Sequence, residues 1–191
     1  MLDKEFWNNL YETAQTGWDI GFPSTPLKTF IDNIENKDKS ILIPGCGRAY
    51  EAEYLYMKGF KKVTIIDLSP LALDAFSKRL PSFPKSQLIE GDFFEHQGQY
   101  DLILEQTFFC ALDPQLRPDY ALKMKSLLKE GGILFGLLFN FPLSAEGPPF
   151  GGSEAEYLNL FRSHFQIQHL EICYNSIKPR AGREFFLELE A

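Results

Sequence analysis

The sequence is poor in the residues that staple small proteins together or hold metal ions. Its 191 residues include three cysteines, Cys46, Cys110 and Cys173, which lie far apart in the chain. An odd number of cysteines without a close pair offers neither a disulfide framework nor the spacing of metal ligands. A chain of this length buries a core without such support. We therefore expect no metal site.

Long apolar runs and concentrated positive charge are missing as well. No stretch approaches the roughly 20 apolar residues of a membrane span, and residues 1–5 carry no apolar signal run. The formal net charge is −7, and the one basic cluster is short, at Lys178, Arg180 and Arg183. A nucleic-acid binder needs a broad basic face. We expect a cytoplasmic monomer that acts on a small molecule, with neither a nucleic-acid nor a membrane partner.

From Ser40 onward, short apolar runs alternate with helical stretches. The expected strands are Ile41–Ile43, Val63–Ile66, Leu88–Ile89, Leu102–Leu104 and Ile133–Phe139. The expected helices are Ala49–Met57, Leu71–Arg79 and Pro118–Leu128. Short strands buried on both faces and separated by helices are typical of a parallel sheet, and right-handed crossovers make that sheet doubly wound.

The two ends of the chain depart from this alternation. Residues 1–14 predict a short amphipathic helix, and a second helix is expected at about Thr25–Ile34. After a helix at Ser153–Phe161, two strands at about Phe165–Tyr174 and Glu184–Leu189 are joined by a loop too short for a helical crossover. We predict a single α/β domain over 1–191, with lid helices in 1–39. Its core, 40–191, is a doubly wound, mostly parallel seven-stranded sheet ending in an antiparallel hairpin.

The first two strand ends carry a glycine turn and an acid. The first strand is followed by Gly45-Cys46-Gly47, and glycine there lets a ligand approach the backbone closely. Asp67 ends the second strand about 20 residues later, where an acid binds the ribose of an adenosine cofactor. Two structural alternatives stay open. Many tight strand-to-helix turns contain glycine for structural reasons alone. Asp67 or Ser69 is also able to cap the helix that Pro70 begins.

The next two strand ends add further polar groups. Asp92 beside Phe93 suits an adenine ring and its amino group, although a loop Asp beside a core Phe explains the pair equally well. Glu105 and Gln106 end the fourth strand and are expected to face the same crevice. A nicotinamide dehydrogenase shares the first two features. It usually shows a third glycine in the turn, and the chain lacks a recognisable hydride-handling pair.

The whole set of motifs resembles the thiopurine S-methyltransferase family, which includes plant and bacterial halide and thiol methyltransferases. The resemblance covers nearly the whole chain, and the aromatic N-terminal segment is its most specific part. The matching motifs are Phe6-Trp7, Thr16-Gly17-Trp18-Asp19-Ile20-Gly21, Pro44-Gly45-Cys46-Gly47, Asp67-Leu68-Ser69, Gly91-Asp92-Phe93-Phe94, Phe108-Phe109-Cys110-Ala111, Arg117 with Tyr120, and Gly147-Pro148-Pro149-Phe150.

The resemblance implies a Rossmann-like class I fold that binds S-adenosyl-L-methionine and releases S-adenosyl-L-homocysteine. It implies that lid aromatics and strand ends enclose this cofactor. The implied cofactor-binding residues are Trp7, Tyr11, Trp18, Gly45, Gly47, Asp67, Leu68, Asp92, Phe93, Glu105 and Gln106. Tyr11 is a departure, since some relatives carry tryptophan there. A Trp face attracts the sulfonium cation, although both tryptophans also suit an ordinary core.

The acceptor side is less defined. Arg117 is a candidate for stabilising an incoming anion, with an exposed position before the helix as the alternative, and Phe150 and Arg183 are further candidates. His96, His164 and His169 have no evident partner, so we identify no general base. A thiolate, hydrosulfide, thiocyanate or halide needs none. Three functions stay open: methyl transfer to such a soft nucleophile, methylation of another small molecule, and a module that binds the cofactor without turnover.

Overall fold

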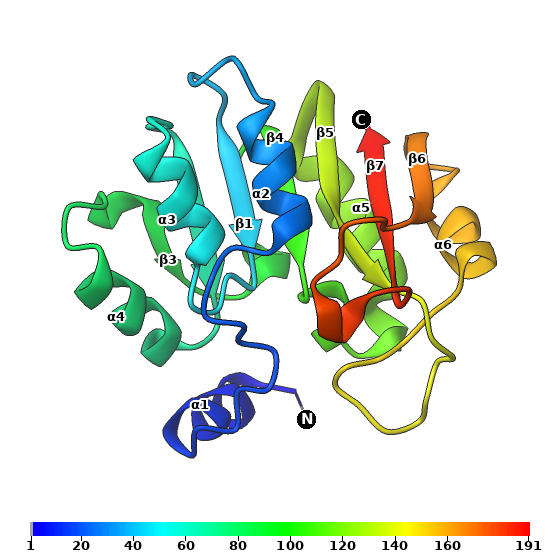
Figure 1. Cartoon of the computed structure of the whole chain (residues 1–191), viewed down its shortest axis with the longest axis horizontal. Coiled ribbons are helices and arrows are strands. Elements are labelled where there is room, and N and C mark those ends of the chain that lie inside the picture. Colours follow the sequence, from blue (N-terminus) through cyan, green and yellow to red (C-terminus); the bar gives the residue numbers. More distant parts are fainter. Residues whose placement is uncertain (1) are drawn as a thin grey trace. The chain divides into compact units, whose positions relative to one another are not determined.

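A computed structural model describes residues 2–191 of the chain. The contacts divide the chain into two compact units, Met1–His96 and Gln97–Ala191 (Figure 1). Within the described residues, no helix is both long enough and apolar enough to cross a membrane.

Unit 1 is built on three parallel strands. They are β1 (Ile41–Pro44), β2 (Val63–Asp67) and β3 (Leu88–Glu90), with β2 between the other two. The residues of β1 are all buried, as expected for a strand covered on both faces. The crossover helices are α3 (Tyr50–Met57) and α4 (Pro70–Arg79). Ser69 caps α4, because its hydroxyl accepts a hydrogen bond from the amide of Ala72.

Two helices precede this sheet, and they differ in burial. Helix α1 (Lys4–Glu12) is capped by Asp3 and has no buried residue, whereas α2 (Thr25–Asp32) buries Pro26, Leu27 and Ile31. Figure 1 shows α1 beside α4, beyond the end to which the β1 arrow points. Helices in proteins are stabilised mainly by packing, so the stability of α1 depends on the few contacts that its side chains make with neighbouring elements.

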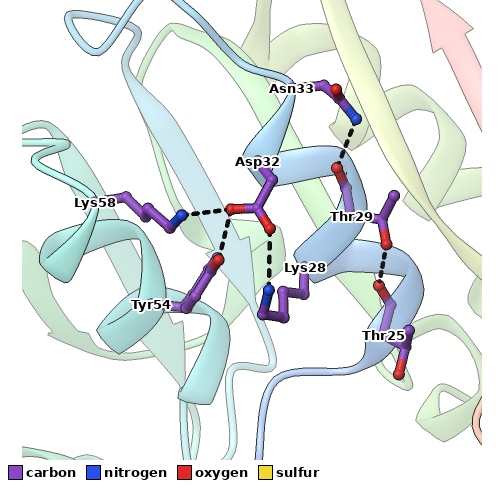
Figure 2. Close-up of polar contacts among 7 residues, drawn as sticks. All are labelled: Thr25, Lys28, Thr29, Asp32, Asn33, Tyr54 and Lys58. Carbon is purple, nitrogen blue, oxygen red and sulfur yellow. Dashed lines mark hydrogen bonds and ion pairs between the residues drawn. The ribbon is translucent and has the colours of Figure 1, made fainter.

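Helix α2 is joined to α3 by a charged cluster around Asp32 (Figure 2). The carboxylate of Asp32 accepts the Tyr54 hydroxyl at 2.5 Å and lies 2.7 Å from the Lys58 ammonium and 3.0 Å from that of Lys28. These donors lower the pKa of Asp32, in the order Lys58, Tyr54, Lys28. The cluster thus links α2 to α3 by polar contacts, in addition to the apolar residues that α2 buries.

Unit 2 contains a mixed group of four strands. Strands β4 (Tyr100–Gln106) and β5 (Leu128–Phe139) are parallel, and β7 (Glu184–Glu190) pairs antiparallel with both β5 and β6 (Gln166–Ile172). Helix α5 (Arg117–Leu127) leads into β5, and α6 (Glu154–Phe161) precedes β6. The short loop between the last two strands thus forms the predicted hairpin.

The strand order is β3-β2-β1-β4-β5-β7-β6 in one seven-stranded sheet. This confirms the predicted doubly wound sheet with its antiparallel hairpin. One boundary differs, because β5 begins at Leu128 rather than near Ile133. The earlier start comes from pairing of Leu128 with Tyr100 of β4, across an irregularity in the register, and Gly131 and Gly132 are hydrogen-bonded to Ala191.

Short 3₁₀ turns were not predicted by the sequence pattern. They are η1 (Lys85–Gln87), η2 (Phe93–Glu95), η3 (Phe109–Ala111), η4 (Pro114–Leu116) and η5 (Lys178–Arg180). Three residues are too few to produce a hydrophobic period, which explains why such turns escape pattern-based prediction.

Candidate active site

The glycine turn of unit 1 is locked to the end of β2 by Asp67. One carboxylate oxygen of Asp67 accepts the Gly47 amide and the other accepts the Ser69 amide, each at 2.8 Å. Gly45 and Gly47 have φ values of +54° and +51°, a region that L side chains rarely adopt. The two strand ends are therefore held together by a single side chain.

The Asp67 carboxylate still has room for a ligand. Burial raises its pKa, and the backbone amides of Ser69, Gly47 and Leu68 counteract that rise. A carboxylate offers about four acceptor positions, so the amide bonds do not exhaust it. The prediction that Ser69 caps the helix is confirmed, but Asp67 also has a structural role that the sequence did not reveal.

Aromatic side chains of the N-terminal segment gather over the glycine turn. Trp18 meets Trp7 and Tyr11 edge to face, with ring centroids 5.6 Å and 5.8 Å apart. A Cβ at Gly47 would lie 3.2 Å from the Tyr11 hydroxyl and 3.8 Å from Nε1 of Trp18. Burial, and secondarily the Asp67 carboxylate, raise the pKa of Tyr11, so its hydroxyl stays protonated. The structure thus brings the predicted lid residues and the predicted turn together.

Asp92 and Phe93 adopt the arrangement of a capped turn. The Asp92 carboxylate accepts the Phe94 amide at 2.8 Å, and the Phe93 ring is buried. Asp92 itself is exposed and therefore remains accessible to a ligand.

In unit 2, the Glu105 side chain is buried and hydrogen-bonded to neighbouring residues. Its side chain is fully buried, and its carboxylate accepts the amides of Phe108 and Phe109 and, at 2.7 Å, the Tyr120 hydroxyl. Burial raises the pKa of Glu105 to about 7. Glu105 therefore has a structural role that the sequence did not indicate, and its contact with the cofactor stays a prediction. Neighbouring strand residues point to opposite faces, so Gln106, which is half-buried, is directed differently.

Arg117 is buried, contrary to the exposed alternative, and its charge is already compensated. It is 3% exposed, forms an ion pair with Glu156, donates to the Gly151 carbonyl at 2.8 Å and lies over the Phe109 ring. With a carboxylate in contact, the guanidinium anchors the loop that contains Gly151. Direct stabilisation of a substrate anion would have to compete with Glu156.

Phe150 and Arg183 border the same loop as Arg117. Phe141 and Gly152 form an isolated bridge that closes this loop, and the Phe150 amide donates to the Cys110 carbonyl at 2.7 Å. The Arg183 guanidinium lies 4.9 Å from the centre of the Phe141 ring. The three predicted acceptor-side residues are thus gathered around residues 141–152 of unit 2.

The surroundings of the histidines and the cysteines in residues 2–191 bear on metal binding. His169 does have partners, contrary to expectation, since its ring nitrogens lie 4.0 Å from the carboxylates of Glu171 and Glu188. It is an exposed residue of β6. Over residues 2–191, no group of three potential metal ligands is present.

Comparison with known proteins decides among the families that share such a sheet. The model of the thiopurine S-methyltransferase family matches residues 2–185. The chain belongs to this family. It is an S-adenosylmethionine-dependent methyltransferase, and the resemblance drawn from the motifs is confirmed.

Relatives within and beyond the family agree with this assignment. A probable thiol methyltransferase 2 of Arabidopsis thaliana is 32% identical over 93% of this chain and 81% of that protein. Thiocyanate methyltransferase 1 of Brassica oleracea is 28% identical over the same shares. The structure of Burkholderia thailandensis 1,6-didemethyltoxoflavin-N1-methyltransferase, with bound S-adenosylhomocysteine, has a TM-score of 0.76 at 17% identity, covering 98% of this chain and 86% of that one. This last likeness concerns the fold.

The residues of unit 1 fit S-adenosylmethionine. Gly45 and Gly47 contribute no Cβ atoms to the turn, the Asp67 carboxylate has an acceptor position beyond its backbone amides, and aromatic side chains lie beside the turn. One contributor in unit 1 escaped sequence prediction, namely Asn8, whose side chain accepts a hydrogen bond from Ser69. Its position carries no pattern that separates it from its neighbours in the sequence.

Proposed function

We propose that this enzyme methylates a small, soft, anionic nucleophile such as a thiolate, hydrosulfide, thiocyanate or halide. The observation that carries the proposal is the aromatic cluster of Trp7, Tyr11 and Trp18 over the glycine turn, because such faces attract a cation and exclude water. The names of the Arabidopsis and Brassica relatives, which refer to thiol and thiocyanate, support the acceptor class.

Each predicted residue has a proposed part in holding the cofactor. Asp67 accepts hydrogen bonds from the ribose hydroxyls, Gly45, Gly47 and Leu68 line the turn, and Asp92 with Phe93 holds the adenine. When bound, the cofactor supplies a methyl group on a cationic sulfonium and is left as S-adenosylhomocysteine. Gln106 remains a candidate cofactor contact at the end of β4.

An anionic acceptor removes the need for a general base. The acceptor forms the new bond with its own lone pair, and no proton has to be moved. The protein's part is then to orient the acceptor and to keep water out. Phe150 and Arg183 at the loop 141–152 are the proposed acceptor contacts, while Arg117 with Glu156 holds that loop in place.

A turnover assay with radiolabelled S-adenosylmethionine tests the proposal. Purified enzyme is offered thiocyanate, iodide, hydrosulfide and a small thiol, with an alcohol and an amine of similar size as controls. We expect labelled product from at least one soft nucleophile and none from the controls. Methylation of the amine or alcohol alone would indicate a different acceptor class. Tight cofactor binding without any product would favour a binding module.

The remaining expectations concern the protein in the cell. The cytoplasmic location, the monomeric state and the absence of a nucleic-acid partner stay predictions. Sedimentation of the purified enzyme at micromolar concentration tests the monomeric state directly.

A further inference from the structure

Two hydrogen bonds of Ser69 link the N-terminal helix to Asp67, the candidate ribose-binding acid. The Ser69 hydroxyl donates to Oδ1 of Asn8 at 2.7 Å, and the Ser69 amide donates to Oδ1 of Asp67 at 2.8 Å. Ser69 is fully buried, although it lies at the start of a helix. Its side chain is therefore fixed by its partners and not by solvent.

The same face of α1 reaches the glycine turn as well. Tyr11 follows Asn8 by three positions, which places the two side chains on one side of the helix. The Tyr11 hydroxyl lies over Gly47, and the Gly47 amide donates to Oδ2 of Asp67. Each carboxylate oxygen of Asp67 is thus linked, through one backbone amide, to a residue that touches α1.

We infer that Asn8 is a positioning residue that couples the lid helix to the orientation of Asp67. The inference rests on the proposed role of Asp67 in binding the ribose. With Asn8 in place, the Ser69 hydroxyl has a fixed acceptor, so the turn that presents the Ser69 amide to Asp67 is held in one conformation. Without Asn8, the hydroxyl loses this acceptor, and the turn that presents the Ser69 amide to Asp67 is held less firmly.

A purely mechanical role for Asn8 predicts a different outcome. Helix α1 is also attached by the ion pair of Lys4 with Glu90, at the end of β3. Both side chains of that pair are about half exposed, and exposed pairs contribute little to stability. If Asn8 only held the helix down, its loss would weaken every ligand that the lid covers, whatever its ribose.

Calorimetry with two ligands separates these roles. S-adenosylhomocysteine and its 2′,3′-dideoxy analogue, which lacks both hydroxyls proposed to contact Asp67, are titrated into the wild type, Asn8→Ala and Asn9→Ala. Asn9 is the matched control, because it is the adjacent residue of α1 and is exposed. We expect Asn8→Ala to weaken S-adenosylhomocysteine about threefold to tenfold, the range of one neutral hydrogen bond, and the dideoxy analogue less than about twofold. Asn9→Ala should resemble the wild type with both ligands.

The results that would contradict this inference differ from those that would contradict the proposed role of Asp67. Equal weakening of both ligands, or no weakening of either, would overturn the coupling role of Asn8. A wild type that binds both ligands equally would refute the ribose role of Asp67 and the inference with it, while turnover with soft nucleophiles would still stand. Melting temperatures of the ligand-free variants within about 2 °C of the wild type show that the fold is intact, since ordinary surface changes have small effects.

Discussion

At the scale of single residues, the carboxylate of Asp67 supports the structure and is also the candidate ligand contact. It accepts the amides of Gly47 and Ser69, which belong to different turns. A buried amide that loses its acceptor costs about 1–3 kcal/mol. Any substitution of Asp67 is therefore expected to affect stability and binding together.

Asp67→Ala should weaken S-adenosylhomocysteine binding by about 1.5–3 kcal/mol, as expected for a charge-assisted hydrogen bond. It should also lower the melting temperature of the ligand-free protein. Calorimetry is carried out well below that lower melting temperature. Asp74→Ala, which removes an exposed acid of α4, is the control for charge. An unchanged dissociation constant for Asp67→Ala would remove Asp67 from the cofactor site.

Glu105 predicts a pH dependence of stability. Its pKa is raised from 4.5 to about 7 in the folded protein, chiefly by burial. The folded state therefore retains a proton that the unfolded state loses, so the contribution of Glu105 is complete below about pH 4.5 and is lost as the pH rises through about 7. The slope is at most about 1.4 kcal/mol per pH unit.

Glu105→Gln mimics the protonated form and should flatten this profile. The free energy of unfolding by urea, measured from pH 5 to 8, should fall more steeply for the wild type than for the variant. Parallel profiles would mean that Glu105 does not titrate in this window. Tyr120→Phe serves as a second variant, because it removes one donor and leaves the carboxyl group in place.

The sequence indicated which residues stand at the strand ends, but not where each side chain points. Glu105 and Gln106 are adjacent, and only the three-dimensional structure shows that Glu105 is the fully buried one of the two. The sequence left open whether Arg117 is exposed before a helix, whereas in the structure it is buried and contacts Glu156, 39 positions away. The spacing of residues along the sequence does not reveal partners that are this far apart.

At the scale of secondary-structure elements, prediction succeeded where local rules are strict. The hairpin of β6 and β7 was foreseen because its loop is too short for a crossover, and α4 because a serine precedes a proline. The extension of β5 was missed, since it depends on an irregular pairing with Tyr100 and on hydrogen bonds to Ala191. The polar link between α1 and the core was also missed, because Asn8 and Asn9 look alike in sequence.

Helix α1 should behave as the movable element. None of its residues is buried, whereas α2 buries Leu27 and Ile31. Hydrogen exchange of residues 4–12 should be fast without ligand and slow when S-adenosylhomocysteine is present, because few buried contacts protect α1 alone. Residues 25–32 should exchange at the same slow rate in both conditions and provide the internal control. Slow exchange of α1 without ligand would identify it as fixed structure.

At the scale of the whole molecule, the proposed reaction is methyl transfer to an anionic acceptor without a general base. The family assignment and the fold establish S-adenosylmethionine as the cofactor, and the anionic acceptor is the proposed part. An acceptor that is always anionic and one that must first lose a proton should then respond differently to pH.

The most direct measurement is the rate at subsaturating acceptor as a function of pH, for thiocyanate and for a small thiol. The thiocyanate rate should be nearly constant from about pH 6 to 9, because the acceptor does not titrate there. The thiol rate should rise with pH and level off near the thiol's own pKa, about 8.5 for an ordinary thiol. A break near pH 6.5 with both acceptors would indicate an essential histidine and contradict the proposed mechanism.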